Sequence, residues 1–224
     1  MKNNVTTYIQ KAYTSPFYLS IHLVLLFIIH SVYVYVYTVS SSLRIDYALQ
    51  IFLRITIWTV PVLIYLMVLK INILDFLKLR QNLIKGIIWG IVIGLLVILL
   101  QGIGIYFQNN NITIKLNIGI GLWLKSIILV GFSEEVLFRG FILKKLRENI
   151  SFGKSNIAQA LLFLLIHFPG WILLNQFVYP NIIGNIAFIF IIGILMGYIL
   201  KKTDSLWSCI IAHSFINFAT ICII

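Results

Sequence analysis

Residues 131–140 read GFSEEVLFRG, which places two adjacent carboxylates, Glu134 and Glu135, and the guanidinium of Arg139 inside an apolar run. The chain of 224 residues has only six acidic side chains, so two of them side by side in such a run call for a reason. Ionisable groups at membrane depth are costly, and they usually face the interior of a helical bundle or a water-filled cavity. The stretch therefore predicts an inward-facing helix around which the rest of the chain is organised.

The composition places this helix in a membrane. The chain is 61% hydrophobic and 10% charged, whereas soluble domains have about 25% charged residues. We expect an all-α, polytopic transmembrane helical bundle that forms a single membrane domain over residues 1–224, with about seven spans of about 20 residues each. The expected spans are 17–37, 47–69, 86–107, 122–143, 157–177, 182–200 and 206–224.

Lysine and arginine are distributed asymmetrically around these spans. With the N-terminus in the cytoplasm, twelve fall in inner segments, two in outer segments and three within spans. Cytoplasmic loops carry an excess of such residues, so the pattern predicts an N-in, C-out topology. The net charge of +11 thus indicates membrane topology, and no nucleic-acid motif accompanies it. The inner residues are Lys2, Lys11, Lys70, Lys78, Arg80, Lys85, Lys144, Lys145, Arg147, Lys154, Lys201 and Lys202, and the outer ones are Arg44 and Lys115.

Small residues predict close helix packing. Glycines recur every fourth position at Gly86, Gly90 and Gly94, and again at Gly193 and Gly197. Such faces let the backbones of two membrane helices approach closely. They indicate a compact bundle and say nothing about chemistry.

The two glutamates have different surroundings on their own helix. Glu135 precedes Arg139 by four residues, the favourable order for an ion pair on one helix face. Glu134 points about 100° away and has no such partner within its helix. A buried carboxylate that is not compensated suits a general base. The alternative is a structural polar cluster at a helix end.

Two histidines lie in other expected spans. His167 shares a helix face with Phe163 and precedes Pro169, which should kink the helix. His213 shares a face with Asn217, and this pair suits either an oxyanion site or a hydrogen bond between helices. Taken alone, a histidine in an apolar helix such as His167 is more often a packing residue, whereas His213 with Asn217 suits either role equally.

Depth favours a joint role. Measured from the nearest inner basic residue, Glu134, His167 and His213 lie at roughly 15, 20 and 16 Å on three different helices. A carboxylate, two imidazoles and the amide of Asn217 thus lie near one level of the membrane.

Four other polar residues in spans have simpler interpretations. His22 and His30, eight positions apart in the first span, suit packing or an interface. Arg54 in the second span and Lys125 at the outer end of the fourth are expected to extend their charges to the membrane surface.

Three motifs in order resemble the CPBP family of intramembrane proteases, also called the CAAX protease and bacteriocin-processing (Abi) family. They cover about the C-terminal half, so residues 116–224 resemble the family's catalytic core, and residues 1–115 correspond to variable N-terminal helices. The matching residues are Glu134, Glu135 and Arg139 for Glu-Glu-x-x-x-Arg, Phe163 and His167 for Phe-x-x-x-His, and His213 and Asn217 for His-x-x-x-Asn.

The resemblance implies an intramembrane endopeptidase with a cavity that opens to the cytoplasmic side. By analogy, Glu134 activates water, His167 orients it, and His213 with Asn217 stabilises the oxyanion, while Glu135 and Arg139 brace the site. The family is described both as glutamate protease and as metalloprotease. Zinc held by Glu134, His167 and His213 is therefore one alternative, and we favour the metal-free one.

The expected substrate is a small membrane-associated or lipidated peptide or protein, cut in the cell membrane. The Ile-, Asn- and Lys-rich composition resembles that of a low-GC bacterium, in which such proteases are associated with bacteriocin immunity or peptide maturation. Two other functions stay open. One is a non-catalytic scaffold or immunity protein of the same fold, and the other is an ion or proton transporter, against which the lack of a repeated half counts.

Overall fold

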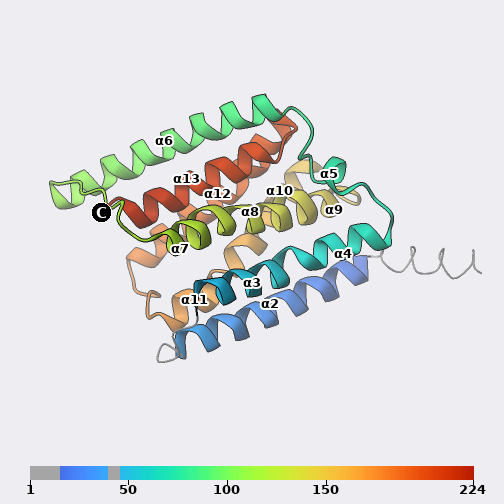
Figure 1. Ribbon diagram of the computed structural model, residues 1–224, viewed down its shortest axis with the longest axis horizontal. Coiled ribbons are helices and arrows are strands. Elements are labelled where there is room, and N and C mark those ends of the chain that lie inside the picture. Colours follow the sequence, from blue (N-terminus) through green and yellow to red (C-terminus); the bar gives the residue numbers. More distant parts are fainter. Residues whose placement is uncertain (1–15, 40–45) are drawn as a thin grey trace, which may run out of the picture.

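The computed structural model describes residues 16–39 and 46–224, and they form a bundle of helices that run roughly along one direction (Figure 1). In this part of the chain the only β-type pairing is an isolated antiparallel bridge between Ile114 and Ile223, so the all-α class is confirmed. The helices are α2 (Pro16–Val39), α3 (Tyr47–Trp58), α4 (Val60–Val68), α5 (Ile73–Phe76), α6 (Leu83–Asn109), α7 (Ile120–Leu122), η1 (Trp123–Leu129), α8 (Val130–Glu135), η2 (Val136–Ile142), α9 (Leu143–Arg147), α10 (Phe152–Leu165), α11 (Phe168–Leu173), α12 (Asn181–Thr203) and α13 (Trp207–Cys222).

Each of the seven expected spans coincides with a helical segment of the structure. Among the described residues, four helical stretches are long and apolar enough to cross a membrane: Tyr47–Val68, Leu83–Asn109, Phe152–Leu173 and Asn181–Thr203. Leu23–Val36 and Trp207–Cys222 are shorter apolar helices, and the helical stretch 120–147 alternates between α and π segments. The protein is therefore a membrane-spanning bundle, while the number of spans and their orientation stay predictions.

The helical stretch 120–147 occupies the middle of the bundle. Figure 1 shows α8 between α13 and α6 on one side and α3 and α2 on the other, and of these helices α13 and α3 pack directly against it. The stretch is continuous from α7 to α9, but η1 and η2 are π-helical on either side of α8. Every residue of η2 is buried. The stretch that decides the fold is thus surrounded by the other helices, as its polar residues predict.

Glycines bring α6 against α13, as their spacing predicts. A Cβ atom added at Gly90 would lie 2.8 Å from the Cβ of Ile211, and one at Gly94 would lie 2.6 Å from the Cβ of Phe215. In the same way α12 meets α10, where a Cβ at Gly193 would lie 2.9 Å from that of Ala160. These approaches exclude any larger side chain, and they hold α13, which carries two motif residues, in place.

The basic residues expected in inner loops gather at one end of the bundle. The ammonium of Lys144 donates to the carbonyl oxygen of Phe76 at 2.9 Å, and that of Lys85 donates to the carbonyl of Lys202 at 2.9 Å. Lys2, Lys11 and Arg44, which the topology argument also used, lie outside the described residues, as does the side chain of His22. We call this end the basic end.

Candidate active site

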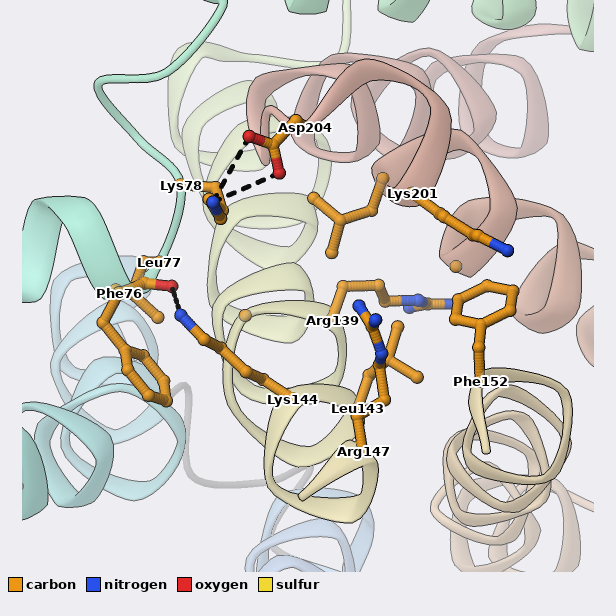
Figure 2. Close-up of a pocket in the computed structure, with 13 residues that line it drawn as sticks. Phe76, Leu77, Lys78, Arg139, Leu143, Lys144, Arg147, Phe152, Lys201 and Asp204 are labelled. Atoms are coloured by element: carbon orange, nitrogen blue, oxygen red, sulfur yellow. Dashed lines mark hydrogen bonds and ion pairs between the residues drawn. The ribbon is translucent and has the colours of Figure 1, made fainter. Parts of the chain in front are cut away.

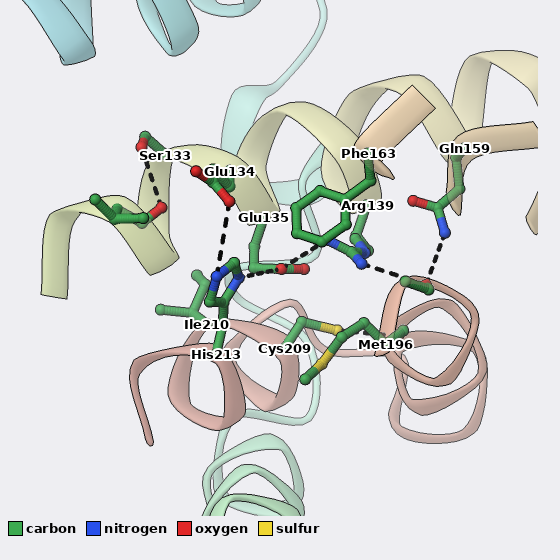
Figure 3. A network of polar contacts seen from close by, with 12 residues as sticks. Ser133, Glu134, Glu135, Arg139, Gln159, Phe163, Met196, Cys209, Ile210 and His213 are labelled. Carbon is green, nitrogen blue, oxygen red and sulfur yellow. Dashed lines mark hydrogen bonds and ion pairs between the residues drawn. The ribbon is translucent and has the colours of Figure 1, made fainter. Parts of the chain in front are cut away.

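The motif residues from three segments meet beside α8 (Figure 3). Glu134 and Glu135 end α8, and Arg139 follows one turn later in η2. Phe163 lies on α10 and His213 on α13, and both face the charged residues of the central stretch in Figure 3. A single-turn π segment inside an α-helix is rare and occurs often at functional sites. Here one begins directly after Glu135.

Glu135 is the centre of a buried polar network. Its Oε1 accepts a hydrogen bond of 2.8 Å from Nη1 of Arg139 and one of 2.7 Å from Nδ1 of His213. Arg139 also donates from Nη2 to the carbonyl of Gly193 at 3.2 Å, and its guanidinium lies 4.4 Å from the ring centroid of Phe163. Both charged side chains are fully buried. The expected ion pair between Glu135 and Arg139 is therefore confirmed. A buried ion pair needs additional partners to offset desolvation, and His213, Gly193 and Phe163 provide them.

Glu134 is not free, and Arg54 does not reach the membrane surface; both predictions are wrong. The guanidinium of Arg54, on α3, donates to Oε1 of Glu134 from Nη1 at 3.2 Å and from Nη2 at 3.0 Å. Arg54 and Glu134 are 80 residues apart in the sequence, so sequence spacing does not predict this pairing. The two residues meet because α3 packs against α8. The other carboxylate oxygen, Oε2, lies 3.7 Å from Nε2 of His213.

His213 bridges the two glutamates. Its Nδ1 faces a carboxylate oxygen of Glu135, which only accepts hydrogen bonds when ionised, so this nitrogen carries the proton. Its Nε2 then faces Oε2 of Glu134. A carboxylate that fixes one ring nitrogen in this way sets the orientation of the imidazole.

His167 lies where the fifth helical segment breaks. α10 ends at Leu165 and α11 begins at Phe168 with Pro169 in its first turn, so the expected interruption beside the proline is confirmed. Nδ1 of His167 donates to the carbonyl of Phe163 at 2.7 Å. Since a carbonyl oxygen only accepts, Nε2 of the neutral ring is left with its lone pair.

Glu134, His167, His213 and Asn217 line one cavity of about 450 Å³. The amide nitrogen of Asn217 and Oε1 of Gln101 are buried and have no hydrogen-bond partner among the described residues. Unpaired buried polar atoms are uncommon in folded proteins, and both residues line this cavity. Gln101 is a cavity residue that sequence reasoning missed, and a glutamine in the long apolar stretch of α6 was the available signal.

The cavity extends from Glu134 away from the basic end. Its exposed lining residues are Gln176, Asn185 and Thr220. Gln176 lies just after α11, Asn185 lies near the start of α12, and Thr220 lies near the end of α13. Lys201 and Lys202 lie at the opposite end of α12, a few residues before α13 begins. With the basic end in the cytoplasm, the mouth of the cavity faces the outer half, which differs from the cytoplasmic opening that the family resemblance implied.

Two other polar residues border the site. His30 is buried, donates from Nε2 to the carbonyl of Ile166 at 3.1 Å and meets Trp58 edge-on, so its packing role is confirmed. Lys125 donates to Oε1 of Gln50 at 2.7 Å. This hydrogen bond gives Lys125 a polar partner on α3, and the expectation that its charge extends to the membrane surface stays a prediction.

The residues proposed as zinc ligands do not fit a metal site in their present geometry. In the part of the chain that the structure describes, no three His, Cys, Asp or Glu side chains are grouped so that they could hold a metal ion. Oε1 of Glu134 is already bound by the guanidinium of Arg54. We therefore derive no step through a metal.

One comparison with known proteins gives a match. Residues 116–219, slightly less than half of the chain, match the family model described as type II CAAX prenyl endopeptidase Rce1-like. The matched segment contains all three motifs. No curated protein and no solved structure matches the chain.

Proposed function

We propose that the protein is a CAAX protease of the CPBP family, which the match over residues 116–219 supports, and that it hydrolyses a peptide bond of a small membrane-associated or lipidated peptide or protein. The observation that carries the proposal is the cavity of about 450 Å³, into which a carboxylate, two imidazoles and an unpaired amide converge. These are the groups that water activation and oxyanion stabilisation require.

Glu134 is the general base of the proposed reaction. Arg54 binds only its Oε1, so Oε2 has no hydrogen bond within the described chain and remains for a water molecule. Oε2 takes a proton as the water oxygen attacks the carbonyl carbon of the scissile peptide. Nε2 of His167 accepts a hydrogen bond from the same water and orients it, because its Nδ1 already donates to Phe163.

His213 and Asn217 stabilise the negative charge that develops on the carbonyl oxygen. The amide N–H groups of Asn217 are available because they have no partner among the described residues. His213 supplies the second donor from Nε2, which carries a proton when the imidazole is in its charged form. The proton on Glu134 then passes to the leaving nitrogen as the C–N bond breaks.

Arg139 and Glu135 position the other groups. Arg139 fixes Glu135, and Glu135 fixes the ring of His213. We propose that the catalytic core comprises residues 116–224 and that α3 contributes Arg54 to it. In this respect the N-terminal helices are part of the site.

The test is comparative peptidomics of membranes that contain wild-type or Glu134→Ala protein. We expect peptides that accumulate with the wild type to be absent with Glu134→Ala, and equally with His167→Ala. Glu148→Ala is the matched control, because Glu148 pairs with Lys145 outside the cavity. Full turnover by Glu134→Ala protein that inserts normally would remove the proposed base.

A specific observation supports a second candidate, a non-catalytic scaffold or immunity protein that binds a partner. The ion pair with Arg54 neutralises the carboxylate that would act as base. A cellular phenotype, such as bacteriocin self-immunity, that survives Glu134→Ala would favour this candidate. A phenotype lost with Glu134→Ala and kept with Glu148→Ala would favour the protease and its role in immunity or peptide maturation.

A further inference from the structure

A second cavity, of about 250 Å³, lies at the basic end and is separate from the one just described (Figure 2). Five of its lining side chains are cationic, and one is a carboxylate. That carboxylate, Asp204, pairs with Lys78 at 3.2 Å. The five cationic residues are Lys78, Arg139, Lys144, Arg147 and Lys201. The cavity thus has a large excess of positive charge.

Three of these cations have no acidic partner among the described residues. The ammonium of Lys144 donates to the carbonyl of Phe76 and lies 3.9 Å from the centroid of its ring. Lys201 and Arg147 both lie over the ring of Phe152, at 4.4 and 5.5 Å from its centroid. Carbonyl and aromatic contacts hold these side chains around the cavity without neutralising them.

The crowding of positive charge has an electrostatic consequence. Partial burial, together with the nearby ammonium of Lys78, lowers the pKa of Lys144. Like charges this close repel one another, and the repulsion is relieved by an anion between them. A bound anion is therefore the arrangement that the charges favour.

The buried end of the cavity points to a specific ligand geometry. Arg139 lines it, is fully buried, and has an Nε–H group for which the described residues offer no acceptor. Buried guanidinium groups normally have all their donors satisfied. An anion with several oxygens that entered from the basic end would meet lysine and arginine donors together.

We propose that this cavity binds a phosphate group at the membrane surface. Basic pockets between helices on the cytoplasmic side suit the phosphates of anionic lipid head groups, and soluble phosphate offers the same oxygens. The inference does not rest on peptide hydrolysis, since no residue of the cavity other than Arg139 belongs to the motifs. It assigns a binding site to residues that the proposed catalysis leaves unused.

The test compares two triple variants that remove the same charge from the same end. The site variant is Lys144→Gln, Arg147→Gln and Lys201→Gln. The control is Lys70→Gln, Arg80→Gln and Lys154→Gln, whose residues do not line the cavity. Native mass spectrometry would measure the affinity of the intact protein for phosphatidylglycerol, for phosphatidylcholine and for inorganic phosphate.

We expect the wild type to bind one phosphatidylglycerol more tightly than phosphatidylcholine. The site variant should lose at least about tenfold more of this affinity than the control, whose loss reflects only general surface attraction. Inorganic phosphate should compete for the site if the phosphate group itself is recognised, and binding of phosphate without binding of lipid would assign the site to the soluble ion.

Equal losses in the two triple variants would overturn the proposal, as would equal affinity for both lipids with no phosphate binding. Lys201→Gln alone guards against a folding defect, because Lys201 is exposed. This single variant should retain the helical circular dichroism of the wild type and still show reduced affinity for phosphatidylglycerol. Wild-type affinity in this variant would likewise contradict the proposal.

Discussion

Glu134 has partners on both sides, and this defines its chemistry at the scale of single residues. Arg54 binds one carboxylate oxygen, and His213 approaches the other. The pairing leaves one oxygen for water while it stabilises a charge that would otherwise be buried alone. It also makes Arg54 a residue whose loss should affect stability.

A double-mutant cycle tests the coupling of these two residues. We expect Arg54→Met to destabilise the protein by about 3–5 kcal/mol, because it leaves the carboxylate of Glu134 buried without a partner. The double variant with Glu134→Gln should lose less than the sum of the single losses, with a coupling of about 1–3 kcal/mol. The measurement is the free energy of unfolding in mixed micelles.

The pair Lys145–Glu148 provides the matched control for this cycle, since Glu148 is half exposed. Its coupling should be about 0.2–1 kcal/mol, as is usual for exposed pairs. Equal couplings for the two pairs would mean that the Arg54–Glu134 contact contributes no more than a surface ion pair.

Asn217 should matter for activity much more than for stability. Its amide nitrogen has no partner within the described chain, so Asn217→Ala breaks no hydrogen bond of that group. We expect kcat to fall about 100- to 1,000-fold, the usual cost of losing an oxyanion donor. The free energy of unfolding should change by less than about 1 kcal/mol.

Thr220→Ala is the matched control for Asn217, because Thr220 lines the same cavity one turn further along α13 and is exposed. Its kcat should stay within about twofold of the wild type, since no oxyanion role is assigned to it. A large loss of stability in Asn217→Ala, with kcat unchanged, would show that the residue has a packing role.

At the scale of elements, α6 and α13 depend on their glycine contact. Gly90→Ala should destabilise the protein by about 1–3 kcal/mol, because the new methyl group would overlap Ile211. Gly104→Ala in the same helix is the control, since nothing lies within 4 Å of its added Cβ. Alanine is the better helix former, so this variant should be at least as stable as the wild type in thermal unfolding. Unfolding temperatures that fall equally in both variants would contradict the contact.

Sequence reasoning found the contacts that lie within one helix and missed those between helices. The pair Glu135–Arg139 follows from a four-residue spacing, and the break beside Pro169 follows from its missing amide hydrogen. The pairing of Arg54 with Glu134 depends on which face of α3 packs against α8, and one sequence does not determine that. The bond from His213 to Glu135 spans 78 positions and was hidden for the same reason.

At the scale of the whole molecule, the cavity mouth and the basic end lie at opposite ends of the bundle. If the basic end is cytoplasmic, as the positive-inside rule predicts, substrate enters from the outer side. The prediction uses single-cysteine variants in a background without Cys209 and Cys222, which are both buried and unpaired. Gln176→Cys marks the mouth, and Lys154→Cys marks the basic end.

An impermeant maleimide added to intact cells should label Gln176→Cys and leave Lys154→Cys unlabelled until the membrane is permeabilised. Both positions are exposed, so differences in local burial do not explain the result. The reverse pattern would place the cavity mouth in the cytoplasm and restore the opening that the family resemblance implied.

The π-helical segments η1 and η2 on either side of α8 also determine how the central helical stretch tolerates changes in length. A π turn contains about one residue more than the α turn it replaces. Each π segment can therefore lose one residue and become an ordinary α turn. Deletion of one residue within η1 is absorbed when that segment tightens to an α turn, and Glu134 keeps its direction. The same deletion within α8 rotates the following residues by about 100°, which separates Glu135 from His213. Within the central helical stretch, the tolerance to gain or loss of a single residue is therefore concentrated in the two segments that border α8.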